Sequence, residues 1–185
     1  MSGEIIKSNQ LHMQGDLAFS KISTFIFDID GVMTDGTVMI LENGLQARRM
    51  SIKDGYALQL AVKSGYTIHI VSGGAPSPVS DRLNKLGIYS IYFSVTDKKS
   101  CVEKIINENK LNADEILFMG DDIPDLPVMP LVGIASCPAD AVAEIKEAAH
   151  YISQIDGGMG CVREVIEKVL KARGHWNHQS STTSA

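Results

Sequence analysis

The feature that most constrains the fold is an alternation of short apolar runs with longer stretches of helical character. The apolar runs are rich in β-branched and aromatic residues, and they predict strands at about 23–29, 67–71, 89–93, 115–119, 131–135 and 151–152. Helices are predicted at about 54–63, 76–86, 97–109, 125–129, 140–149 and 160–172. This alternation predicts an α/β fold, in which a Rossmann-like parallel sheet is covered by helices on both faces to give three layers.

The segment at about 37–50 departs from this alternation, because two short extended runs flank the pair Asn43-Gly44. An Asn-Gly pair in this setting is a strong signal for a β-hairpin. The interval from Asp30 to Ser72 holds only this hairpin and a helix, so no inserted cap domain is expected. We therefore expect one capless domain at 21–173 with a hairpin flap, a loosely held lead at 1–20 and a disordered tail at 174–185.

Composition and charge argue against several classes of protein. The 185 residues carry a formal net charge of -5, which is unfavourable for binding the phosphate backbone of nucleic acid. No apolar run approaches the ~18 residues that a membrane-spanning helix needs. The N-terminus lacks the apolar core of a signal peptide, and the three cysteines match no zinc pattern. We expect a cytoplasmic protein with no membrane and no nucleic-acid partner.

Two carboxylates follow the first predicted strand. Asp28 and Asp30 are two residues apart, so in an extended chain they point to the same side, about 7 Å from each other. Carboxylates at the end of a buried strand repel one another and lose hydration, and a divalent cation compensates both effects. A calcium loop of the EF-hand type fits poorly, because Val32 and Met33 stand where a ligand and a glycine belong. A pair of helix-capping aspartates is the other structural explanation.

Polar side chains also follow the later strands. Ser72 and Gly73 come after the second strand, Lys98 after the third, and Asp121 with Asp122 after the fourth. In parallel sheets, ligands bind beyond the carboxyl ends of the strands, where the strand order reverses. A carboxylate approaching a phosphate at 4 Å is repelled by about 4 kcal/mol per unit-charge pair at an effective dielectric near 20. Because a cation and a lysine offset this repulsion, the set predicts phosphoryl transfer.

These residues resemble the four motifs of the haloacid dehalogenase superfamily of phosphatases. The first motif corresponds to Asp28–Thr34, the second to Ser72, the third to Lys98 and the fourth to residues 120–125, in the order that the family shows. The likeness covers nearly the whole of 21–173. It implies an HAD-like fold and a phosphoric monoester hydrolase.

The resemblance also implies roles for individual residues. Asp28 would be the nucleophile and would form an aspartyl-phosphate, and Asp30 would be the general acid and base. Magnesium would be bound by Asp28, Asp121 and the backbone carbonyl of Asp30. Ser72 and the backbone at Gly73 would hold the transferring oxygens, and Lys98 would neutralise their charge. Either of two further aspartates would orient metal-bound water or the lysine: Asp122 or Asp125.

Within that superfamily the chain looks most like the 3-deoxy-D-manno-octulosonate 8-phosphate phosphatases, which make lipopolysaccharide precursor. The supporting stretches are 30–36, 53–55, 81–87, 96–98 and 157–164. This resemblance implies a small sugar-acid phosphate as substrate, and a homotetramer whose hairpins form an intersubunit barrel and whose neighbouring chains complete each active site. The same chemistry on a nine-carbon keto-sugar acid 9-phosphate is an alternative, and a non-catalytic module of the same fold is a further one.

The sequence does not decide which residue would bind the carboxylate of the substrate. Many relatives have arginine where this chain has Gly74 and Met159. Arg82 and Arg163 are candidates for that anion or could equally be solvated surface charges, and for Lys53 the surface reading is favoured. Asp54 is a candidate substrate contact or the N-cap of its helix.

Overall fold

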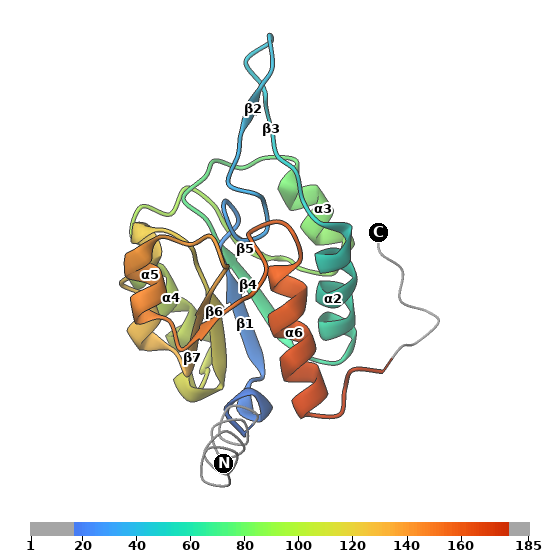
Figure 1. The fold of residues 1–185 in the computed structure, drawn as a ribbon, viewed down its shortest axis with the longest axis vertical. Helices are drawn as coiled ribbons and strands as arrows, with labels where there is room; N and C mark the ends of the chain where they lie inside the picture. The colour runs from blue at the N-terminus through green and yellow to red at the C-terminus, as the bar shows by residue number, and fades with distance from the viewer. Residues whose placement is uncertain (1–16, 178–185) are drawn as a thin grey trace, which may run out of the picture.

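Six parallel strands form the central sheet in the computed structural model, which describes residues 17–177 (Figure 1). The strands pair in the order β5-β4-β1-β6-β7-β8, and every pairing is parallel. The predicted parallel α/β sheet is confirmed. The strand bounds are Thr24–Phe27 for β1, Thr67–Val71 for β4, Ser90–Tyr92 for β5, Ile116–Met119 for β6, Ile134–Cys137 for β7 and Tyr151–Ile152 for β8.

Helices cover both faces of this sheet and bury a separate apolar core under each (Figure 1). The side chains of Phe25 and Phe27 belong to one core and that of Ile26 belongs to the other, because successive side chains of a strand point to opposite faces. The first core is covered by α2 (Ile52–Lys63), α3 (Val79–Lys85) and α6 (Cys161–Ala172), and the second by α4 (Lys98–Asn109) and α5 (Ala143–Ala148).

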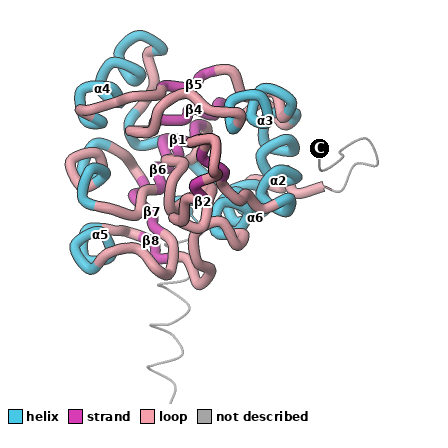
Figure 2. The backbone as a smooth tube through the Cα atoms, turned by 90° about the horizontal axis from the view of Figure 1, so that it is seen from above, coloured by secondary structure: helices cyan, strands magenta, loops and turns pink. Residues whose placement is uncertain are grey.

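The strand order reverses at β1, which lies between β4 on one side and β6 on the other. The loops that follow these strands meet at one edge of the sheet, seen from above in Figure 2. A crevice at such a reversal point is where open α/β sheets bind their ligands. The fold therefore places the polar strand ends predicted from the sequence at a suitable location.

The predicted hairpin projects from this same edge (Figure 1). Its paired strands, β2 (Met39–Ile40) and β3 (Gln46–Ala47), are antiparallel and only two residues long. Gly44 turns the chain with a φ of 79°, a value that glycine adopts without steric cost. A bridge between Thr34 and Met50 closes the base of the hairpin. Between β1 and β4, the described chain holds this hairpin and α2 with no cap domain, as predicted.

Several predicted boundaries were wrong by a few residues. Helix α2 is capped by Ser51, whose hydroxyl oxygen accepts a hydrogen bond from the Asp54 backbone N–H at 3.4 Å. Asp54 is therefore the third residue of the helix and not its cap. Strand β7 begins at Ile134, because the preceding residues form the 3-10 turn η3 (Met129–Leu131). Two other 3-10 turns flank β6, η1 (Ala113–Glu115) and η2 (Ile123–Asp125).

Both ends of the described chain pack on the domain. Residues 17–21 are helical, and the buried ring of Phe19 meets Tyr151 edge-on with centroids 5.5 Å apart. At the other end, the Trp176 ring packs edge-on against Tyr56 of α2 with centroids 6.3 Å apart. The prediction of a disordered tail was thus wrong for residues 174–177. The remainder of the predicted lead and tail, 1–16 and 178–185, lies outside the described residues.

No helix within residues 17–177 has the length and apolar character that crossing a membrane requires.

Candidate active site

A cavity of about 390 Å³ lies at the carboxyl ends of β1, β4 and β6. A larger hollow of about 690 Å³ lies along α6, but it is a solvated helix face on which Glu167 pairs with Arg163 and Lys171. The smaller cavity is the candidate active site, because most of the predicted site residues line it: Asp28, Asp30, Ser72, Gly73, Lys98, Asp121, Asp122 and Asp125.

Lys98 holds the centre of this cavity together. Its buried ammonium lies 2.8 Å from Asp28 Oδ2 and 2.7 Å from Asp125 Oδ1. As the first residue of α4, this lysine places a positive charge at a helix N-terminus, which is unfavourable unless acidic groups compensate. Burial alone lowers the pKa of Lys98, but the carboxylates of Asp28 and Asp125 outweigh it and raise the pKa overall. The lysine is therefore charged and fixed in position.

Among the described aspartates that line this cavity, Asp28 and Asp121 are the two with a buried, unpartnered oxygen. Each has a buried Oδ1 atom with no hydrogen-bond partner. Burial, followed by the charge of neighbouring carboxylates, raises the pKa of each side chain to about 7. A buried carboxylate oxygen without a partner is costly unless a cation binds it. The two residues therefore fit a divalent cation held by oxygen ligands.

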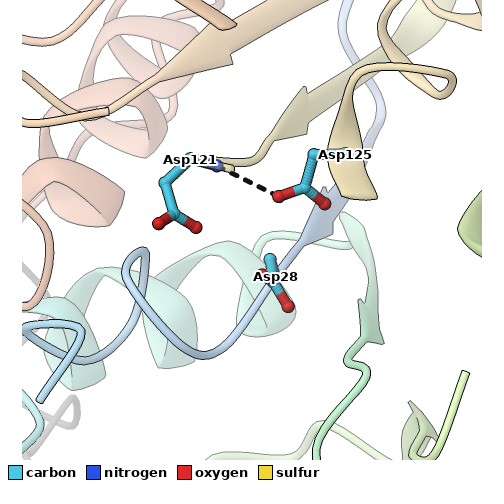
Figure 3. Close-up of side chains that lie close together, drawn as sticks. All are labelled: Asp28, Asp121 and Asp125. Atoms are coloured by element: carbon cyan, nitrogen blue, oxygen red, sulfur yellow. Dashed lines mark hydrogen bonds between the residues drawn. The ribbon is translucent and has the colours of Figure 1, made fainter. Parts of the chain in front are cut away.

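Asp125 lies beside these two aspartates but serves a different purpose. Oxygen atoms of Asp28, Asp121 and Asp125 come within 4.8 Å of one another. Figure 3 shows the three side chains close together. Both oxygens of Asp125 are already engaged, Oδ1 by Lys98 and Oδ2 by the backbone N–H of Asp121 at 3.1 Å. Asp125 therefore orients the lysine and the Asp121 loop. Asp122, the alternative for this role, is exposed and caps η2 through its own side chain.

Gly31 makes room for Asp121. Its φ is 85°, and a Cβ atom at this position would lie 1.9 Å from Asp121 Oδ2. No side chain fits there without displacing that carboxylate. The glycine that follows Asp30 is thus required by the close approach of the loop after β1 to the loop after β6.

Ser72 and Gly73 both line this cavity, directly after β4. The buried Ser72 hydroxyl oxygen accepts a hydrogen bond from the Gly74 backbone N–H at 3.1 Å. Its own O–H is free to rotate and donate to an oxygen in the cavity that it lines. The turn that follows β4 therefore offers a hydroxyl donor to the cavity.

The structure does not bring the other predicted contacts into this cavity. Buried Asp54 accepts a hydrogen bond from the Arg163 backbone N–H at 2.7 Å and so caps α6, and burial raises its pKa to about 6. The Arg163 guanidinium stacks over the rings of Tyr56 and Trp176 at 5.7 and 5.4 Å. Arg82 donates to the Ser51 carbonyl at 3.5 Å. These three side chains have structural partners and, within one chain, do not line this cavity.

One residue of the site was missed by the sequence analysis. Arg48 leaves the base of the hairpin and donates from Nε to Asp30 Oδ1 at 2.5 Å and from Nη2 to Asp30 Oδ2 at 3.3 Å. Its side chain is 13% exposed. No local sequence pattern predicts this pair, because the two residues are 18 positions apart and belong to different elements.

Comparisons with known proteins show the family to which the chain belongs. Residues 84–160 match the model of the haloacid dehalogenase-like hydrolase family. The 3-deoxy-D-manno-octulosonate 8-phosphate phosphatase of Yersinia pestis is 32% identical over 154 residues, covering 83% of this chain and 82% of that protein. The phosphatase of the same name from Escherichia coli K12 is 33% identical over 153 residues, covering 83% and 81%.

Solved structures give the same result. The crystal structure of the Yersinia pestis phosphatase matches with a TM-score of 0.84 and 31% identity, and the match covers 86% of each chain. The Moraxella catarrhalis phosphatase, solved in complex with a magnesium ion, a phosphate ion and KDO, matches with a TM-score of 0.84 and 27% identity over 87% of this chain and 92% of that one.

Proposed function

Since the chain belongs to the haloacid dehalogenase-like hydrolases and, among them, to the 3-deoxy-D-manno-octulosonate 8-phosphate phosphatases, we propose that it hydrolyses this eight-carbon ester to the sugar acid and phosphate. The observation that carries the proposal is the buried Asp28–Lys98–Asp125 network with Asp121 beside it. The product would supply lipopolysaccharide synthesis. The three free cysteines fit an enzyme of the reducing cytoplasm.

Magnesium is the cofactor that this site fits. Asp28 and Asp121 would hold it through their unpartnered oxygens, with the backbone carbonyl of Asp30 as a further ligand. When bound, the ion neutralises charge on the phosphate and lowers the repulsion between phosphate and carboxylate.

In the first step, a carboxylate oxygen of Asp28 attacks phosphorus and the ester P–O bond breaks. Lys98 opposes the negative charge that gathers on the equatorial oxygens, and Ser72 with the N–H groups around Gly73 donates to them. Asp30 gives its proton to the leaving sugar oxygen. The products of this step are the free sugar acid and a phosphorylated Asp28.

In the second step, Asp30 takes a proton from water, and the resulting hydroxide attacks the phosphorus of phosphorylated Asp28. The bond between phosphorus and the Asp28 oxygen breaks, which regenerates the carboxylate and releases inorganic phosphate. Asp30 ends protonated, ready for the next leaving group. Asp125 contributes by holding Lys98 in place throughout.

We also propose that the working enzyme is a homotetramer. The hairpin carries large exposed apolar side chains, with Met39 65%, Ile40 75% and Leu45 62% exposed. A two-stranded hairpin is only marginally stable alone, and clustered exposed apolar groups mark contact surfaces. The hairpin projects from the edge that carries the cavity, so a second copy packed on it would also cover the site (Figure 1).

Steady-state phosphate release in the presence of magnesium tests the function. The eight-carbon ester should have the higher kcat/KM when compared with a nine-carbon keto-sugar acid 9-phosphate, and preference for the nine-carbon ester would move the substrate assignment.

Asp28→Asn should abolish nearly all turnover, because an amide is a poor nucleophile. Turnover should fall by at least about 10³-fold while inorganic phosphate still binds. Asp114→Asn makes the same chemical change at an exposed position and should leave activity intact. Activity of Asp28→Asn within tenfold of the wild type would contradict the covalent mechanism.

A further inference from the structure

We propose that Arg48 binds the carboxylate of the substrate, and that it does so by exchanging its ion pair with Asp30 for one with the sugar acid. This inference rests on the proposed function and adds to it the residue that recognises the acid.

The charges around the cavity leave the substrate's carboxylate without a partner there. A sugar-acid phosphate brings a phosphate and a carboxylate, yet five aspartates and one lysine are the charged groups that line the cavity. That lysine already contacts Asp28 and Asp125 and faces the phosphate position. A second anion in such surroundings needs a cation from outside the lining.

Arg48 is the guanidinium at the rim. A Cβ atom built on Gly74, which lines the cavity, would lie 3.2 Å from Asp30 Oδ2 and 3.8 Å from Arg48 Nη2. The absence of a side chain at Gly74 therefore opens the space beside this ion pair to a ligand in the cavity. Arg82 and Arg163 have other partners, and exposed Arg49 pairs with Asp35 at 2.9 Å.

The contact between Arg48 and Asp30 shows what the guanidinium can recognise. Two of its nitrogen atoms face the two oxygens of one carboxylate. This paired arrangement is the one that arginine prefers for carboxylates, and the carboxylate of a sugar acid presents the same two oxygens. The Asp30 side chain is 37% exposed, so its half of the contact is open to exchange.

The exchange has a consequence for catalysis. Asp30 must turn toward the leaving oxygen to give its proton, and a carboxylate fixed to Arg48 is held away from that task. When the substrate's carboxylate occupies the guanidinium, Asp30 is released for proton transfer. The acid group of the substrate would thus be bound and would also prepare the general acid.

The test compares two esters on four proteins. The esters are 3-deoxy-D-manno-octulosonate 8-phosphate and D-arabinose 5-phosphate, which carries a phosphate but no carboxylate. The proteins are the wild type, Arg48→Gln, Arg48→Lys and Arg49→Ala, the last as the control at an exposed neighbouring arginine. Urea unfolding of each protein separates loss of binding from loss of fold.

Arg48→Gln should lower kcat/KM for the acid about 10- to 100-fold, mostly through KM, because a charged hydrogen bond is removed. It should not lower kcat/KM for the arabinose ester, because that ester has no carboxylate for Arg48 to bind and the variant frees Asp30 for proton transfer. Arg48→Lys should recover part of the loss, since it restores charge without the fork. Equal losses on both esters, or no loss on the acid, would overturn the inference while leaving the phosphatase function intact. A wild type that hydrolyses neither ester would instead refute the proposed function.

Discussion

The two oxygens of the buried Asp28 side chain have different surroundings. Oδ2 pairs with the Lys98 ammonium, and Oδ1 has no hydrogen-bond partner among the described residues. The carboxylate of Asp121 also has a buried oxygen without a partner, and the nearby charge of Asp28 raises its pKa further. Asp28 is buried and Asp121 is half-buried, and carboxylates that lose hydration bind protons or a cation more tightly than exposed ones do. Protons and a metal ion would therefore compete for the same carboxylate oxygens of Asp28 and Asp121.

This competition predicts how magnesium stabilisation depends on pH. The pKa of Asp28 and of Asp121 is about 7 in the folded chain, against 3.8 for an ordinary aspartate. Between about pH 4 and 7 the folded chain therefore binds more protons than the unfolded chain, and the stability from these protons is lost as the pH rises through 7. Magnesium must displace the protons, so the increase in Tm that magnesium produces should grow from pH 5.5 to pH 8.

Thermal unfolding with and without magnesium checks this expectation across that pH range. Asp121→Asn removes one of the two free carboxylates and should abolish most of the magnesium-dependent increase in Tm. An increase in Tm that is the same at every pH would contradict the assignment of these two residues as ligands.

At the scale of elements, the loop after β1 is held in place by the segment before α6. The Gly158 backbone N–H donates to the Val32 carbonyl at 2.9 Å, and the Cys161 thiol donates to the same oxygen at 3.2 Å. Asp54 in turn caps the first turn of α6 from α2. The C-terminal helix thereby fixes the loop that follows Asp28 and Asp30, although none of its own residues lines the cavity.

Gly158→Ala tests this support. A Cβ atom there would lie 2.5 Å from the Asp35 backbone nitrogen, and the φ of 66° disfavours any side chain. Gly65→Ala is the matched control, because its φ of 86° carries the same penalty with nothing within 4 Å. Both variants should lose about 1 kcal/mol from the left-handed conformation, and Gly158→Ala should lose about 1–3 kcal/mol more from the clash.

Urea unfolding and kcat measured on both glycine variants distinguish the two effects. We expect kcat to fall in Gly158→Ala, because the clash displaces the loop at Thr34–Asp35, and to stay unchanged in Gly65→Ala. Equal destabilisation of the two variants would show that the loop yields without consequence.

At the scale of the whole molecule, the hairpin is the element whose apolar side chains a single chain leaves exposed. The side chains of Met39 and Ile40 extend away from the sheet and contribute to neither core. The domain below is complete, with both faces of the sheet covered (Figure 1). The hairpin is therefore where we expect copies of the chain to associate.

Ile40→Asp should break this association, because a carboxylate buried at each hairpin contact loses hydration without a partner. Sedimentation should show a tetramer for the wild type and a smaller species for the variant, with reduced activity. Tyr89→Asp introduces the same charge at a residue that is 77% exposed but lies off the hairpin, and it should remain tetrameric. A wild type that is an active monomer would refute the tetramer.

The sequence by itself determined the parallel sheet, the strand ends and most of the charged and polar residues that line the cavity. Short continuous apolar runs specify strands that are buried on both faces, and the polar residues that end them fall at one edge by the geometry of parallel sheets. Asp28, Ser72, Lys98 and Asp121 follow from this local pattern, and their spacing and order supported the family resemblance. The structure brings all four to one cavity.

Only the tertiary structure decided which charged groups become partners. Asp125, and not Asp122, meets Lys98 because the turn η2 points it inward. Asp54 caps a helix 109 positions away, and Arg48 reaches Asp30 from the hairpin. Such pairs depend on how packed elements place long side chains in space. The local pattern of residues does not encode which distant side chains meet in space. For this reason the sequence could propose the reacting groups but not the residues that hold them.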